Sequence, residues 1–169
     1  MPYILTMYLA AAVMVLTTDW CHAGVLAHTR PPAESRPGLR SATPLEQAVF
    51  QQVNAYRVRQ QLPALQWQES LAQQARQHSQ AMLASTQVGH AGFAQRLAAV
   101  GRVLPWASAA ENVAYTQGMQ DPVTQAVQGW LNSPGHRHNL EGPFTLTGIG
   151  VAVNARGEVA FTQIFLKPK

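Results

Sequence analysis

Residues 130–139 read Trp-Leu-Asn-Ser-Pro-Gly-His-Arg-His-Asn, and the fold of the chain is interpreted outward from this stretch. A helical pattern of apolar residues runs into it from Asp121. Pro134 and Gly135 then end that helix and turn the chain sharply. His136 comes directly after the turn, so we expect the backbone to hold its imidazole at a fixed angle, pointing into a cleft.

Two other residues are candidates for the same cleft. His90 lies in the glycine-flanked connector Val-Gly-His-Ala-Gly, and Glu111 lies in Ala-Glu-Asn-Val-Ala. We expect both to meet His136. Two imidazoles and a carboxylate suit Zn²⁺, which takes N and O ligands and keeps a position open for water or substrate. The alternative is a metal-free polar cleft whose histidines hydrogen-bond each other and Glu111, because lone histidines are mostly structural.

Composition favours one folded domain with a sizeable core. The chain has 169 residues, of which 47% are hydrophobic and 12% charged, and this excludes a disordered protein. The formal net charge is +4. Ten of the twelve basic residues are arginines, and they are spread from Arg30 to Arg156 without a run of like charge. Nucleic-acid binders cluster such residues on one element, so no nucleic-acid partner is expected.

The N-terminus is interpreted as a targeting segment. The stretch 3–18 is apolar apart from threonines, and small residues before position 24 suit a signal peptidase. We therefore expect a signal peptide over 1–23 and a secreted, periplasmic or cell-envelope protein. No Lys or Arg precedes Arg30, so an uncleaved anchor stays open, and membrane contact is expected only through this segment. Cleavage after Ala23 would remove the lone Cys21, leaving a domain without disulfides.

The remaining sequence predicts helices first and strands last. A Pro- and Gly-containing linker covers 24–43, and the domain covers 44–169, starting with Thr43 as a helix N-cap. Helical spacing of apolar residues predicts helices over 45–60, 69–85, 93–100 and 121–132. Residues 103–110 are expected to be irregular. Strands are predicted over 146–153 and 158–166, joined by a hairpin turn, which gives an α+β fold with an antiparallel sheet.

A series of short motifs runs in order through about 45–166. They are Val53-Asn54-Ala55-Tyr56-Arg57, Leu62–Trp67, His78 and Met82, His90, Glu111-Asn112-Val113-Ala114, Trp130 with Ser133–Arg137 and Asn139, Gly148–Ala152, and Thr162–Phe165. In this order, the motifs resemble bacterial members of the CAP superfamily (SCP-like domains), which includes cysteine-rich secretory proteins, antigen 5 and pathogenesis-related proteins.

This resemblance implies an α-β-α sandwich, in which a small antiparallel sheet lies between helices, with a central cleft lined by histidines and acids. Carried over by motif, the cleft residues are His90, Glu111 and His136, and some family members hold a divalent metal such as zinc there. The second acid that other members place one turn after the tryptophan is missing, because residues 131–133 are Leu-Asn-Ser. The disulfides of animal and plant members are also absent.

Polar neighbours of these three residues are expected to support the cleft. Asn112 and Asn139 would pin loops around it, and Gln163 would supply a polar position beside the sheet. Glu111 has two possible roles, as a general base beside a bound water or as the acceptor that fixes a histidine tautomer. His78 shares a helix face with apolar residues and is expected in the core.

Three functions remain open from the sequence. The first is an exported binding or interaction module for an extracellular, envelope or lipid ligand, or for a peptide or glycan. The second is a metal-dependent hydrolase that uses water on a metal held by His90, Glu111 and His136. The third is a secreted scaffold with a vestigial cleft.

Overall fold

The computed structural model describes residues 42–169. The predicted signal peptide or anchor, and the predicted linker up to residue 41, lie outside the described residues. Ala42 is buried and Thr43 caps the first helix, so both belong to the folded domain. None of the helices formed by residues 42–169 is long and apolar enough to span a bilayer.

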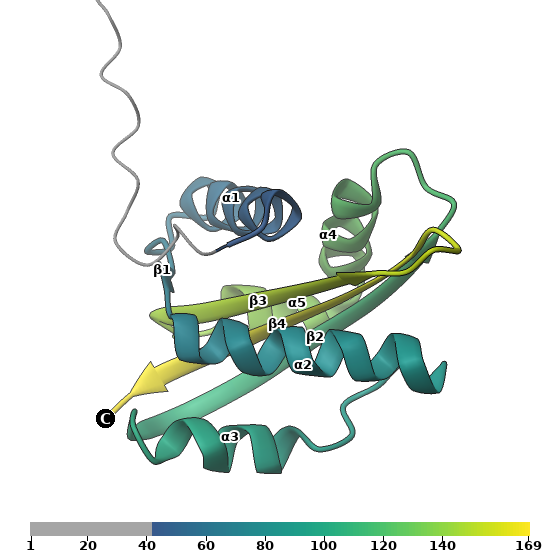
Figure 1. Cartoon of the computed structure of the whole chain (residues 1–169). Coiled ribbons are helices and arrows are strands. Elements are labelled where there is room, and N and C mark those ends of the chain that lie inside the picture. The colour runs from purple at the N-terminus through teal and green to yellow at the C-terminus, as the bar shows by residue number, and fades with distance from the viewer. Residues whose placement is uncertain (1–41) are drawn as a thin grey trace, which may run out of the picture. The chain divides into compact units, whose positions relative to one another are not determined.

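The four predicted helices and the late hairpin are present, and β1, β2 and α5 are additional elements between them (Figure 1). Their bounds are α1 Pro44–Arg59, β1 Gln66–Trp67, α2 Glu69–Ser85, α3 Phe93–Gly101, β2 Trp106–Gln117, α4 Pro122–Asn132, α5 Pro134–Glu141, β3 Leu146–Val153 and β4 Glu158–Pro168.

The four strands form one sheet in the order β1-β3-β4-β2. β3 and β4 are the predicted antiparallel hairpin, with Ile149 opposite Gln163. β2 pairs antiparallel with β4 on its other side, so that Glu111 lies opposite Ile164. β1 adds two residues parallel to β3 at the far edge. The long strand β2, which carries Glu111, is therefore an edge strand.

Two local predictions were wrong. Residues 106–110, expected to be irregular, are the first half of β2, and they pair with the end of β4. Their Ala- and Ser-rich sequence has little strand propensity, so the pairing partner decides their structure. The turn at Pro134 and Gly135 does end α4, but the chain enters another helix there, because proline is well suited to the first position of a helix. His136 therefore lies on α5.

Helices cover both faces of the sheet, which confirms the predicted α-β-α sandwich (Figure 1). Side chains along β4 point alternately to the two faces. Phe161 and Phe165 pack in a core with residues of α1, α4 and α5. Ile164 and Leu166 pack on the opposite face with residues of α2 and α3.

Two glycines of β3 let α2 lie directly on the sheet. A Cβ atom built on Gly148 would come within 2.1 Å of the Ala72 nitrogen, and one on Gly150 within 2.0 Å of the Arg76 nitrogen. Real Cβ atoms do not approach backbone so closely, so only glycine fits at these two positions. The contact fixes α2, and with it His78, relative to the strands.

On the opposite face of the sheet, the buried Arg57 links α1 to the end of α5. Arg57, at the end of α1, is 1% exposed, and its guanidinium donates to the backbone oxygens of Pro63, Leu140, Gly142 and Phe144. Burial lowers the pKa of Arg57 from its ordinary value. Three of these bonds, to Leu140, Gly142 and Phe144, satisfy carbonyls at and after the end of α5, and so hold the helix that carries His136.

Candidate functional site

His90 and Glu111 are in contact at the α2–α3 side of the sheet. His90 comes from the connector between α2 and α3, and its Nδ1 lies 3.0 Å from Oε1 of Glu111. Since a carboxylate only accepts, Nδ1 carries the hydrogen, and Nε2 is left for other partners. The Glu111 side chain is 1% exposed and that of His90 is 51% exposed. The solvent-accessible imidazole of His90 is thus hydrogen-bonded to the buried carboxylate of Glu111.

Arg96 of α3, which the sequence analysis did not single out, is the strongest partner of Glu111. Its Nη2 lies 2.8 Å from Oε1 and 2.7 Å from Oε2 of the carboxylate, and its Nε lies 3.0 Å from Oε2. This is the fork geometry in which arginine binds carboxylates most strongly. The sequence feature that could have indicated a role for Arg96 is its place as the single basic residue of a short apolar helix, Phe-Ala-Gln-Arg-Leu-Ala-Ala-Val-Gly.

His78 of α2 is a hydrogen-bond partner of Arg96. Its Nε2 is 2.7 Å from the Gly89 carbonyl, which can only accept, so the neutral ring has its hydrogen on Nε2. Its Nδ1 therefore accepts from Nη1 of Arg96 at 3.1 Å. Burial lowers the pKa of His78 and keeps the ring neutral, as this bond requires. His78 is 7% exposed, in agreement with its predicted core position. We call His78, His90, Arg96 and Glu111 the polar cluster.

His136 approaches from α5, held by two asparagines. Asn112 of β2 donates from Nδ2 to the His136 backbone oxygen at 3.0 Å, and Asn139 donates to Oδ1 of Asn112 at 2.9 Å. Burial, and then the nearby His90, lower the pKa of His136. Among the described residues, the His136 ring has no hydrogen bond to His90 or Glu111. The two asparagines thus join α5 to β2, whereas from the sequence they are expected to pin loops.

Gln163 lies apart from the polar cluster. It is fully buried in β4, and its Nε2 donates to the Thr147 hydroxyl of β3 at 3.1 Å. Its Oε1 has no hydrogen-bond partner among residues 42–169. Gln163 is thus a buried polar group within the sheet, with no bond to His90, Glu111 or His136.

The donor set does not fit a zinc ion as the chain is arranged. No group of three or more His, Cys, Asp and Glu side chains within residues 42–169 is placed to hold a metal. Both carboxylate oxygens of Glu111 already accept from Arg96, and the guanidinium puts a positive charge where a dication would need a negative one. The predicted zinc site stays a prediction, and Arg96 weighs against it.

Comparison with known proteins places the chain in a family. Residues 50–165 match the model of the cysteine-rich secretory protein family, CAP. Two Bacillus subtilis proteins, the uncharacterized membrane protein YlbC and the uncharacterized protein YkwD, are each 32% identical over 74% and 75% of this chain. These stretches are 35% and 48% of the two relatives, so the chain spans less than half of either.

Solved structures agree with this assignment. An extracellular SCP-domain protein of Bacillus anthracis is 35% identical, with a TM-score of 0.59 over 73% of this chain and 40% of that protein. An outer surface protein of Borrelia burgdorferi, 19% identical, has the same fold, with a TM-score of 0.65 over 74% of this chain and 93% of that one. On the family match and these likenesses together, the chain belongs to the cysteine-rich secretory protein (CAP) family.

Proposed function

We propose that the chain is an exported module that binds an organic ligand at the polar cluster by hydrogen bonds, without a metal ion. The observation that carries this proposal is the contrast in exposure between His90, at 51%, and Glu111, at 1%. The His90 imidazole is open to solvent and is hydrogen-bonded to the buried Glu111 carboxylate. A group fixed in this way suits ligand recognition, because little conformational freedom is lost on binding.

Arg96 supports binding over hydrolysis. In a metal-dependent hydrolase, a carboxylate serves as metal ligand or as base toward the bound water, and both roles need a free oxygen lone pair. The Arg96 guanidinium bonds both oxygens of Glu111 and places a positive charge beside them, which opposes the binding of a metal cation. The hydrolase remains the alternative, and it would require Arg96 to leave the carboxylate.

Export is supported by two observations of different kinds. The apolar stretch 3–18 at the start of the sequence suits a targeting segment. The SCP-domain relative from Bacillus anthracis, 35% identical, is an extracellular protein. A domain whose described part, residues 42–169, contains no cysteine also needs no oxidising partner to fold after export.

The test is an NMR titration of protein labelled with ¹³C at histidine Cε1. Four probes are added separately: Zn²⁺, tri-N-acetylchitotriose, the blocked peptide acetyl-Ala₄-amide, and dodecanoate. We expect one organic probe to shift the His90 resonance in a saturable manner while the probe itself stays chemically unchanged. His90→Ala should abolish the binding, and His138→Ala, which alters an exposed histidine of α5, is the matched control.

The other outcomes would contradict the proposed metal-free binding module. Cleavage of the peptide or the glycan, lost in His136→Ala, would establish the hydrolase. Saturable shifts with Zn²⁺ alone would overturn the metal-free site. No shift with any probe would favour a scaffold with a vestigial cleft.

A further inference from the structure

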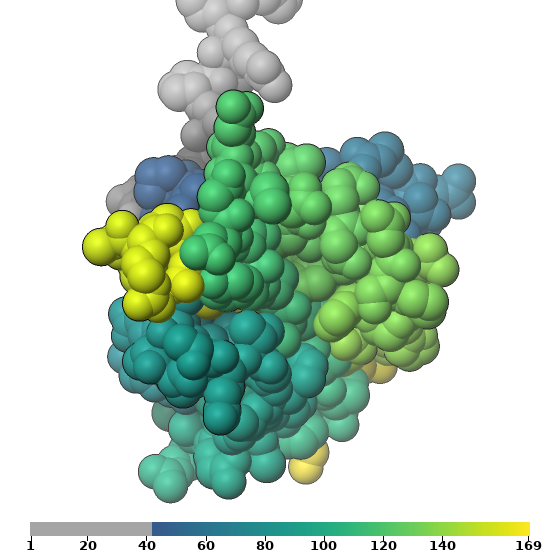
Figure 2. Space-filling view, turned by 90° about the vertical axis from the view of Figure 1, so that its right-hand side faces the viewer, coloured from purple at the N-terminus to yellow at the C-terminus, as the bar shows by residue number. Residues whose placement is uncertain are grey.

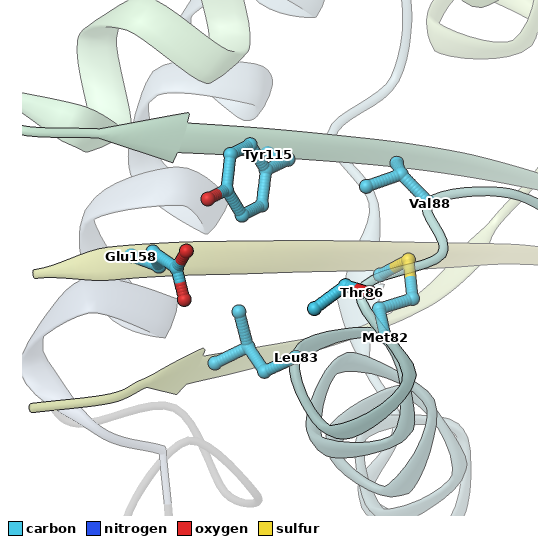
Figure 3. A pocket seen from close by; sticks show the side chains of 6 residues that line it. All are labelled: Met82, Leu83, Thr86, Val88, Tyr115 and Glu158. Atoms are coloured by element: carbon cyan, nitrogen blue, oxygen red, sulfur yellow. The ribbon is translucent and has the colours of Figure 1, made fainter. Parts of the chain in front are cut away.

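A partly open pocket lies beyond the polar cluster, at the C-terminal end of α2. Its volume is about 220 Å³, and it is lined by Met82, Leu83, Thr86, Val88, Tyr115 and Glu158. In Figure 3 the Glu158 carboxylate and the Tyr115 hydroxyl lie at one end of the pocket, and Val88 and Met82 lie at the other. The pocket is therefore amphipathic, with an apolar wall and a polar end.

Exposed apolar side chains gather around this pocket. Val88 is 51% exposed and Tyr115 is 40% exposed, and both line it. A second hollow, lined by the exposed Val153 among others, shares Leu83 and Thr86 with the pocket. Figure 2 shows the end of the molecule where the β3–β4 hairpin (yellow), the end of β2 (green) and the end of α2 (teal) meet. Contiguous apolar surface with a polar rim marks binding sites in soluble proteins.

The charge at the polar end is negative. Of the residues that the structure describes, Glu158 is the only charged one that lines the pocket. Hydrogen bonds from Arg156, Asn154 and Tyr115 lower the pKa of Glu158 to about 2, so the carboxylate is ionised at any physiological pH. Arg156, its ion-pair partner at 2.6 Å, has a side chain that is 62% exposed and lines the second hollow instead. The Arg156 guanidinium does not line the pocket, so a cation inside it would contact the carboxylate and not the guanidinium.

We propose that this pocket binds a small organic cation that has an apolar body, such as an aromatic or alkyl amine. A dry cavity of about 150 Å³ holds one benzene ring, so 220 Å³ is enough for a ring with a short tail. The ring lies against Met82, Leu83 and Val88, and the ammonium lies between the Glu158 carboxylate and the face of Tyr115, where carboxylate and π-electrons both attract it.

This site is independent of the proposed function, because neither His90 nor Glu111 lines it. Two probes with the same apolar body and opposite charge test it: phenethylammonium and 3-phenylpropionate. Methyl NMR spectra of Leu83, Val88 and Met82 report binding to each. We expect phenethylammonium to bind about tenfold more tightly, since one charge contact near the surface changes sign between the two probes.

Three variants make the result decisive. Glu158→Gln should remove the preference for the cation, and Arg156→Gln, which frees the carboxylate from its partner, should increase it. Val88→Trp should fill the pocket and abolish binding of both probes, and because Val88 is 51% exposed we expect the variant to fold. Equal binding of the two probes, tighter binding of 3-phenylpropionate, or unchanged binding in Val88→Trp would each overturn the proposal.

Discussion

Two buried glutamates of this fold are each held by an arginine, and they lie in very different surroundings. The Glu46 side chain, in α1, is 0% exposed and accepts from Nε and Nη2 of Arg76, both at 2.9 Å. The Glu111 side chain is 1% exposed and accepts from the fork of Arg96. The two pairs have the same chemistry and their carboxylates are nearly equally buried, but the remaining neighbours of the two carboxylates differ.

The remaining partners of Glu46 are backbone groups. It accepts from the Thr43 nitrogen at 2.9 Å, which completes the capping box of α1, and from the Val151 nitrogen of β3 at 3.3 Å. Arg76 in turn also bonds Glu69. This pair therefore joins α1, α2 and β3, and its role is structural.

The remaining partner of Glu111 is the exposed His90. Here the ion pair ends at a side chain that water and ligands can reach, and two more histidines lie close by. We infer from this difference that the Glu46 pair is a structural link, and that the Glu111 pair supports the exposed His90 of the proposed binding site.

The largest effect is expected from Arg76→Met. It leaves the Glu46 carboxylate buried with only backbone donors, so the free energy of unfolding should fall by about 3–5 kcal/mol. Urea unfolding followed by circular dichroism measures this, and the Cε1 resonances of His90 and His136 should stay unchanged in the folded protein. A loss below about 1 kcal/mol would show that Glu46 is not a structural link.

Arg96→Met should cost less, about 1–3 kcal/mol, because the His90 side chain remains hydrogen-bonded to the Glu111 carboxylate. The same unfolding experiment compares the two variants directly. A loss equal to or larger than that of Arg76→Met would contradict the assigned difference between the pairs.

Acid should destabilise the protein through the buried His78 of the polar cluster and its neighbour His136. Burial lowers the pKa of both His78 and His136 below the ordinary 6.5. The unfolded chain therefore takes up protons first as the pH falls below about 6.5, and stability decreases until the folded histidines are also protonated. Unfolding at pH 7.5 and 5.5 measures this loss, and His78→Gln should reduce it. Equal stability at both pH values would exclude buried neutral histidines.

The smallest effect is expected on the pKa of His136. His90 contributes to lowering the pKa of His136, so His90→Ala should raise that pKa, while burial keeps it below its ordinary value. The Cε1 shift of His136 followed against pH measures the change, with His138→Ala as a control. An unchanged titration would mean that α5 does not bring His136 close to His90.

Regular elements of this fold were predictable from the sequence, and contacts between distant elements were not. The helix over 69–85 and the hairpin of β3 and β4 have clear periodicity, and both were predicted correctly. The first half of β2 was missed because its Ala and Ser residues form a strand only through pairing with β4. α5 was missed because Pro134, interpreted as an end, also begins a helix.

The candidate site was only partly predictable, for the same physical reason. His90 and Glu111 are 21 residues apart, and no spacing rule reports a contact of that range, so their meeting was inferred with the help of family resemblance. Arg96 gave no motif signal, yet it makes the closest bonds to Glu111. The pairing of Arg96 with Glu111, which argues against a metal, could therefore be found only from the structure.

Calorimetric titration of the protein with Zn²⁺ at pH 7.5 tests the central claim most directly, with Arg96→Met measured alongside. Our account predicts no stoichiometric binding by the unaltered protein, because Arg96 occupies both oxygens of Glu111 and no third donor among residues 42–169 is placed to complete a site. Binding that appears only in Arg96→Met would show that the guanidinium excludes the metal. Tight 1:1 binding by the unaltered protein that His136→Ala abolishes would contradict the account.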